Sequence, residues 1–129
     1  MKLDNRGQSL VMFVVIVPLL LLVLAMVVDI GNLVNNKIEI NSVNKLAISY
    51  GIDNIDKDNI ENEVKDIINK NYKDIDDIKI SIQDEKISID LKCYSKSIFG
   101  NIIGTKGYLI ESSYKAYMDS DKKRIEKVK

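Results

Sequence analysis

The chain has 129 residues, of which 19 are basic and 19 are acidic, and it contains one cysteine and no histidine or tryptophan. Because the formal net charge is zero, the chain lacks the basic excess of nucleic-acid-binding proteins, and we expect no nucleic-acid partner. A lone cysteine excludes an internal disulfide, and the absence of histidine removes the commonest general base and metal ligand. We therefore expect no enzyme, no metal site and no cofactor.

An unbroken apolar run extends from Leu10 to Val28, with Pro18 as its only poor helix former. About 20 residues at ~1.5 Å per residue cross a hydrocarbon core of ~30 Å, so this run is long enough to span a bilayer. A chain of this size is too small to bury a helix that is apolar on all sides. The sequence therefore predicts a transmembrane helix over residues 8–29.

The charges that flank the run predict its orientation. Residues 1–7 form a short leader with Lys2 and Arg6 against Asp4, and positive charge ahead of a first span favours a cytoplasmic N-terminus. We expect a single-pass protein of the cytoplasmic membrane whose residues 30–129 form an exported domain. A cleaved signal peptide is disfavoured, because its apolar region is usually ~7–15 residues and ends in a small-x-small site.

Short motifs border the apolar run at both ends. The segment Arg6-Gly7-Gln8-Ser9-Leu10-Val11-Met12-Phe13 opens it, Pro18 follows, and Val28-Asp29-Ile30-Gly31 closes it. This pattern resembles the N-terminus of TadE-like pseudopilins of the tight-adherence (Flp-type) pilus systems, a branch of the type IV pilin superfamily. The resemblance implies cleavage by a prepilin peptidase between Gly7 and Gln8. It also implies a set of family-motif positions, which are Arg6, Met12, Phe13, Pro18, Asp29 and Gly31.

Met12 departs from the family pattern. The superfamily usually carries Glu at the fifth residue after the cut, where a carboxylate can pair inside the membrane with the N-terminal amine of a neighbouring subunit. Met12 cannot form that pair, so the resemblance implies a minor pseudopilin or pilus assembly subunit rather than a major fibre subunit. The implied partners are other pilins and pseudopilins, the inner-membrane assembly platform, the prepilin peptidase and the lipid bilayer. The pilus or the cell surface is a further implied location.

Three points stay open at the level of sequence. The alternative to a pseudopilin is an unprocessed, signal-anchored membrane protein with a small exported binding domain. Asp29 either faces water at the membrane interface, which is the favoured interpretation, or contacts another subunit or the assembly platform. Pro18 either kinks the helix or is tolerated without a kink.

Beyond the membrane, the helix is expected to continue over residues 30–50, with some flexibility at Gly31 and a stop at Gly51. Its asparagines fall mostly away from the predicted apolar face. A second, amphipathic helix is predicted over residues 58–72, with a solvated charged face. The acidic residues Asp74, Asp76 and Asp77 are interpreted as a polar turn, because they lack the glycine and terminal glutamate of a calcium loop.

Alternating apolar residues predict strands over residues 78–82, 87–93 and 108–118, the first two as a hairpin with Cys93 buried on its apolar face. Residues 95–107 are expected to form a crossover loop with one helical turn, and residues 119–129 a frayed, charged tail. The predicted fold class is α+β: a long N-terminal helix, a second helix and a three-stranded antiparallel sheet packed on them. This plan resembles that of pilins.

Overall fold

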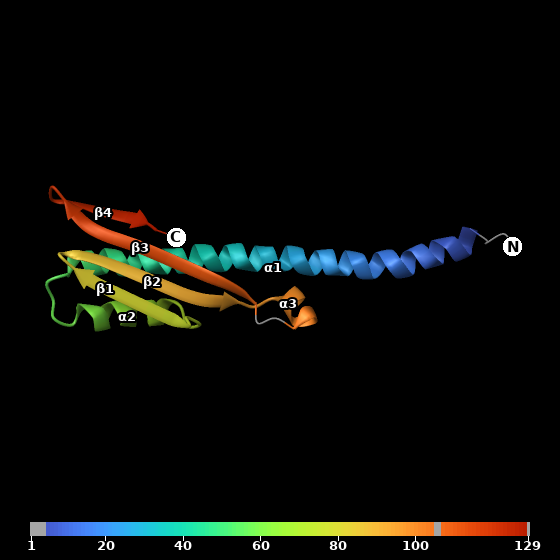
Figure 1. Cartoon of the computed structure of the whole chain (residues 1–129), viewed down its shortest axis with the longest axis horizontal. Coiled ribbons are helices and arrows are strands. Elements are labelled where there is room, and N and C mark those ends of the chain that lie inside the picture. The colour runs from blue at the N-terminus through green and yellow to red at the C-terminus, as the bar shows by residue number, and fades with distance from the viewer. Residues whose placement is uncertain (1–4, 105–106, 129) are drawn as a thin grey trace.

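The computed structural model describes residues 5–104 and 107–128. Residues 1–4 of the predicted leader, residues 105–106 of the predicted crossover and residue 129 of the tail lie outside the described part. The elements in chain order are α1 (Asn5–Asp53), α2 (Ile60–Asn71), β1 (Asp77–Gln83), β2 (Lys86–Ser95), α3 (Ile98–Ile103), β3 (Tyr108–Asp119) and β4 (Lys122–Lys127). Figure 1 shows α1 as a long rod whose C-terminal half lies against the sheet and whose N-terminal half projects away from it.

Helix α1 is continuous over 49 residues, which corresponds to about 73 Å at the standard rise per residue. It passes through Gly31 without a break. The predicted stop at Gly51 is wrong, since the helix continues to Asp53. Gly51 is buried where α1 meets two other elements: a Cβ there would lie 2.5 Å from Ile87 Cδ1 and 3.3 Å from Val64 Cγ2. The glycine permits close packing inside a helix rather than ending one.

The sheet has the strand order β1-β2-β3-β4, and every neighbouring pair is antiparallel. The predicted hairpin is present, with Ile80 opposite Ile89. Its two turn residues, Asp84 and Glu85, have φ values of 51° and 63°. Two successive residues with positive φ are characteristic of the turn whose twist matches that of a β-hairpin. The turn therefore sets the register that places the apolar residues of both strands on the same face.

The prediction of three strands and a frayed tail is wrong, because β4 pairs with β3 as a fourth strand. The connecting turn again has two residues with positive φ, Ser120 at 49° and Asp121 at 65°. Every residue of β4 is exposed, so this edge strand carries no apolar alternation that a sequence pattern could detect. Lys123 links it to α1, with Nζ 2.7 Å from Ser49 Oγ and 3.0 Å from Asp53 Oδ2.

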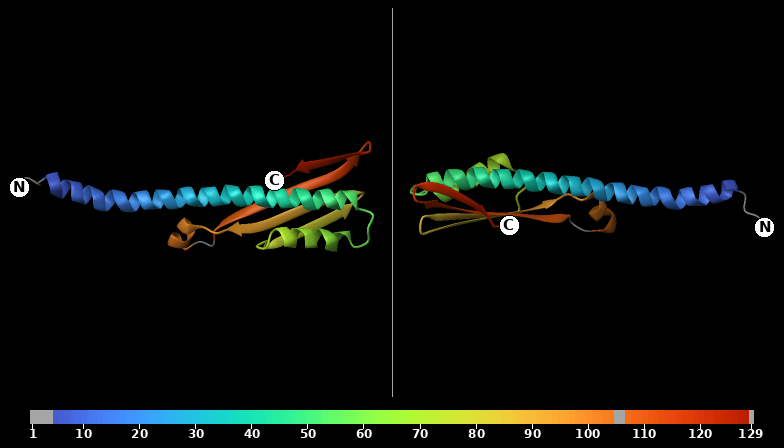
Figure 2. Two further views of the ribbon diagram at one scale, coloured as in Figure 1. Left: turned by 180° about the vertical axis from the view of Figure 1, so that it is seen from behind. Right: turned by 90° about the horizontal axis from the view of Figure 1, so that it is seen from above.

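One face of the sheet packs on the C-terminal half of α1 and on α2, and the three together enclose the core (Figure 2). Helix α2 contributes Ile60, Val64 and Ile68, which recur on one side as its amphipathic pattern predicts. From β2, alternate residues from Ile87 to Cys93 are fully buried. The predicted α+β, pilin-like arrangement of a long helix, a second helix and an antiparallel sheet is thus confirmed.

Polar side chains of α1 also face the sheet. The amide of Asn36 donates to Ser95 Oγ at 3.0 Å, and Asn41 Oδ1 accepts from Ser112 Oγ at 2.7 Å. Asn44 is fully buried, and its Nδ2 lies 3.1 Å from both the carbonyl oxygen and the hydroxyl of Ser112. The expectation that the asparagines fall mostly away from the packed face is wrong for these three. We refer to Asn36, Asn41, Asn44, Ser95 and Ser112 as the polar seam.

The polar seam fixes how α1 lies on the sheet. Apolar contacts tolerate sliding of a helix, whereas a buried amide loses its hydrogen bonds if the helix shifts, and an unsatisfied buried polar group is costly. Asn44 Nδ2 also donates to the carbonyl oxygen of Ile89 at 3.2 Å, so one side chain forms hydrogen bonds with two adjacent strands. The seam therefore selects one register of the helix among several that an apolar face would permit.

Replacement of Asn44 by alanine is expected to lower the free energy of unfolding by about 1–3 kcal/mol, because the Ser112 hydroxyl loses a buried partner and the removed amide leaves a void. Thermal unfolding of the full-length chain in detergent micelles, followed by circular dichroism, measures the change. Asn35→Ala is the matched control, since Asn35 is an exposed asparagine of the same helix. Equal stability of the two variants would contradict a structural role for the seam.

Candidate functional site: the exposed half of helix α1 and its contact with helix α3

The N-terminal half of α1 has no protein partner within the described part of the chain. Its large apolar side chains are all exposed, with Leu10 at 69% and Phe13 at 70% of their full accessible surface. Among the described residues, α1 is the one helix long and apolar enough to cross a membrane, judged by length and composition. Exposed apolar surface on this scale marks a segment that meets lipid or another protein. This is compatible with a single membrane anchor.

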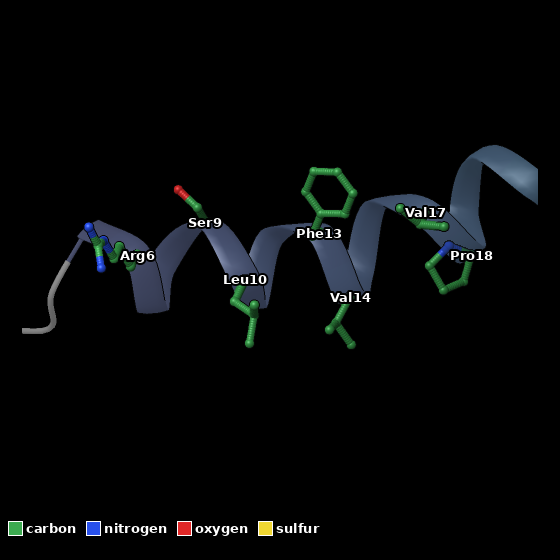
Figure 3. Close-up of a pocket in the computed structure, with 7 residues that line it drawn as sticks. All are labelled: Arg6, Ser9, Leu10, Phe13, Val14, Val17 and Pro18. Carbon is green, nitrogen blue, oxygen red and sulfur yellow. The ribbon is translucent and has the colours of Figure 1, made fainter.

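The residues predicted to take part in processing lie at the start of this exposed half. Arg6, Gly7 and Gln8 are exposed and fall in the first turns of α1. Figure 3 shows the side chains that line a shallow groove along one flank of the helix, which are Arg6, Ser9, Leu10, Phe13, Val14, Val17 and Pro18. Because one helix supplies all of them, the groove has no opposite wall. It offers apolar contact to lipid chains or to another helix, and no enclosed site for a small ligand.

Two further motif positions lie within the same exposed half. Helix α1 continues through Pro18, although proline lacks the N–H that would bond to the carbonyl of Val14. The proline therefore interrupts one backbone hydrogen bond without ending the helix. Met12 is 59% exposed and presents a thioether where the family usually presents a carboxylate. Gly31 lies farther along, and no atom lies within 4 Å of the position of an added Cβ, so packing inside the described chain does not require a glycine there.

Asp29 ends the apolar run, and its side chain does not face water. The residue is only 1% exposed. Its carboxylate accepts three hydrogen bonds: from Ser97 Oγ at 2.6 Å, from the backbone N–H of Ile98 at 2.7 Å and from that of Phe99 at 2.9 Å. The favoured interpretation of Asp29 as a water-facing residue is therefore wrong. Asp29 instead joins the middle of α1 to α3, at a sequence separation of about 70 residues.

Helix α3 owes both of its ends to side-chain and backbone chemistry. Ser97 precedes it, and its Oγ accepts from the N–H of Gly100 at 2.6 Å. Gly104 closes it in the left-handed conformation, with φ of 83°. A six-residue helix is too short to be stable alone. The Asp29 carboxylate stabilises it by accepting from N–H groups of the first turn and by placing negative charge at the positive end of the helix dipole.

The described residues hold no group of three or more His, Cys, Asp or Glu side chains that could bind a metal ion. Cys93 is buried on the core face of β2, as its alternation predicts. Its Sγ lies 3.7 Å from the Tyr72 hydroxyl, and burial raises the pKa of the thiol. A thiol held neutral in this way is a poor nucleophile.

Part of helix α1 is similar in sequence to a known protein family. Residues 7–43 match the family model of TadE-like protein. Over this segment the chain is similar to TadE-like proteins. The match covers less than half of the chain, and it includes the exposed half of α1, Asp29, Asn36 and Asn41. No curated protein and no solved structure matches the chain.

Asp29→Ala is expected to release α3. The backbone N–H groups of Ile98 and Phe99 lose their acceptor, so their hydrogen exchange should accelerate by roughly tenfold or more. Hydrogen–deuterium exchange of the full-length chain in detergent micelles, read on the peptide that covers α3, measures this. Asp53→Ala is the control, because Asp53 lies on the same helix but pairs with Lys123 at the other end of the domain. Unchanged exchange in α3 would show that Asp29 does not hold it.

Alkaline pH is expected to destabilise the fold through Cys93. Since burial raises the thiol pKa above its ordinary value of 9.0, the unfolded chain releases this proton first as the pH rises. The thiol's stabilising contribution is therefore complete below about pH 9 and is lost as the pH rises toward the folded-state pKa, with a slope of at most about 1.4 kcal/mol per pH unit.

A series of denaturant unfolding curves across this pH range tests the expectation, with Cys93→Ala as the comparison. The variant should lose the part of the decline that begins near pH 9. It should keep the decline at higher pH that arises from Tyr72 and Tyr114, because burial also raises the pKa of both phenols. Parallel pH profiles for the variant and the native chain would show that Cys93 does not contribute.

Proposed function

We propose that this TadE-like protein is a minor pseudopilin, a subunit that takes part in pilus assembly by helix packing and protein–protein contacts. Residues 8–29 anchor it in the cytoplasmic membrane, with residues 1–7 in the cytoplasm and residues 30–129 outside. Its partners are other pilins and pseudopilins, the inner-membrane assembly platform and the prepilin peptidase. The system is a tight-adherence (Flp-type) pilus or a related secretion system.

The observation that carries this proposal is the division of α1 into two halves. Every large apolar side chain from Leu10 to Val28 is exposed, whereas the C-terminal half of α1 is packed against the sheet. A soluble domain would cover the first half or lack it. The segment that matches the TadE-like model spans the junction between the two halves, so the family resemblance and the unusual distribution of surface coincide in the same residues.

The proposed processing site is the bond between Gly7 and Gln8. Cleavage there would place a new N-terminus two residues ahead of Leu10, where the apolar run begins. No part of the described chain packs against a Cβ at position 7, so no other element covers the site. Met12 supplies no carboxylate to pair with a neighbouring amine, which supports a minor subunit that contributes apolar contact rather than a repeating one.

A second candidate function is an unprocessed, signal-anchored membrane protein with a small exported binding domain. One observation favours it: α1 begins at Asn5, so Gly7 and Gln8 already lie in helical conformation. A peptidase needs the backbone of its substrate to be accessible, and a helix hides the backbone behind its own hydrogen bonds. In this alternative the first turn of α1 persists, and residues 1–7 stay attached.

The N-terminal sequence of the protein isolated from membranes of its native cells separates the two functions. A pseudopilin should begin at Gln8, and Gly7→Leu should leave the full-length chain because a bulky residue blocks the peptidase. Gly31→Leu is the control, since it changes a glycine of the same helix away from the cleavage site and should leave processing intact. Retention of Met1 in cells with an active prepilin peptidase would overturn the pseudopilin proposal.

A further inference from the structure

We propose that α3 is a second membrane contact, which lies in the headgroup region of the bilayer with Ile98 and Ile102 directed into the lipid. This inference rests on the proposed anchoring of α1 in the membrane. It concerns a surface of the domain outside the anchor and outside the segment that matches the TadE-like model. The surface consists of Ile98 and Ile102, and we call it the lipid-facing patch.

The contact between Asp29 and α3 sets the height of the patch. Asp29 follows directly on the apolar run, so it lies where a helix spanning the bilayer leaves the hydrocarbon core. The backbone N–H groups of Ile98 and Phe99 lie within 2.9 Å of its carboxylate. Helix α3 is therefore held at the level of the membrane boundary. Figures 1 and 2 agree that α3 is the part of the domain nearest to the free half of α1.

The patch exposes apolar side chains next to the proposed span. Ile98 is 49% exposed and Ile102 is 60% exposed, and their spacing of four places them on one face of α3. Tyr108, at the adjoining end of β3, is 39% exposed. Apolar residues beside a tyrosine are typical of segments that lie at the boundary between lipid chains and headgroups.

The local charge also fits a bilayer surface. The chain as a whole has equal numbers of acidic and basic residues, but residues 94–110 contain two lysines and no acidic residue. One of these lysines, Lys96, is exposed directly before α3. An exposed lysine without acidic neighbours in sequence is attracted to anionic headgroups. The only carboxylate described in contact with α3 is that of Asp29, which is buried and fully engaged.

Lipid fits this patch better than a second protein does. Two partly exposed side chains provide far less area than the ~800 Å² that each partner contributes to a stable protein interface. A membrane contact needs no such area, because α1 already holds the patch at the bilayer. Helix α3 also packs directly beside α1. A second attachment point would prevent the domain from rotating about the axis of its anchor.

Because the chain contains no tryptophan, one introduced tryptophan reports its own surroundings. We suggest three full-length variants, Ile102→Trp in the patch, Leu20→Trp in the proposed span and Leu46→Trp as the matched control. Leu46 is 53% exposed on α1, about 25 Å beyond Asp29 along the helix. Each variant is reconstituted into phosphatidylcholine–phosphatidylglycerol vesicles with lipids brominated either near the headgroup or near the chain end, and quenching of fluorescence is measured.

The proposal predicts that Trp fluorescence in the Ile102 variant is quenched more strongly by lipid brominated near the headgroup than near the chain end. The Leu20 variant should be quenched most strongly by bromine near the chain end, and the Leu46 variant should not be quenched. Quenching in the Leu20 variant but not in the Ile102 variant would overturn the lipid-facing patch and leave the anchor intact. A blue shift in the Ile102 variant without quenching would instead indicate a protein partner and would also overturn it.

Absence of quenching in the Leu20 variant would overturn the membrane anchor itself, and with it both the proposed function and the patch. Circular dichroism of the three variants confirms that each is folded before the comparison is made. All three replaced residues are more than half exposed, so a larger side chain meets no packed neighbour.

Discussion

Helix α1 has to satisfy two different environments along one backbone. Its backbone hydrogen bonds are internal to the helix, so the backbone needs no outside partner in lipid or in water. The side chains therefore decide where each half can lie. From Leu10 to Val28 they offer apolar contact in every direction, and from Asp29 onward they alternate between a packed face and a solvated one. The remaining elements are arranged around that change, since the sheet and α2 cover only the second half.

Several contacts that join α1 to α3 and to the sheet are polar, although apolar contacts would bury more apolar surface. Asp29 binds the start of α3, and the polar seam follows along the same helix toward its C-terminal end. Each of these contacts demands one relative position of helix and sheet, whereas the isoleucine-rich core around them would accept several. The price of that selectivity is a buried amide oxygen, Asn44 Oδ1, without a hydrogen-bond partner among the described residues. Packing supplies the stability, and the polar contacts supply the alignment.

Patterns of local periodicity were sufficient to predict helices α1 and α2, the hairpin of β1 and β2, and strand β3. They failed where the deciding contact is distant in sequence or involves only the backbone. Strand β4 has no buried residue, so its pairing leaves no alternation to detect. Gly51 resembles a helix stop until the neighbouring Ile87 is placed against it. The local sequence predicted that Asp29 and Asn44 lie away from the packed face. Their partners, Ser97 and Ser112, lie 68 residues away in sequence, where no local pattern reveals them. Ser97 followed by Gly104 was a local signal for α3, but no local signal shows what caps it.

The continuity of α1 has a mechanical consequence. No loop separates the exposed half of α1 from the half that packs on the sheet. The two halves therefore move as one rigid rod, which would pivot near Asp29. A tilt of about 10° in the N-terminal half would move the C-terminal end of the helix, about 36 Å beyond that point, by roughly 6 Å. A force applied to the exposed apolar half of α1 would thus displace the domain of residues 30–129, because no flexible hinge absorbs it.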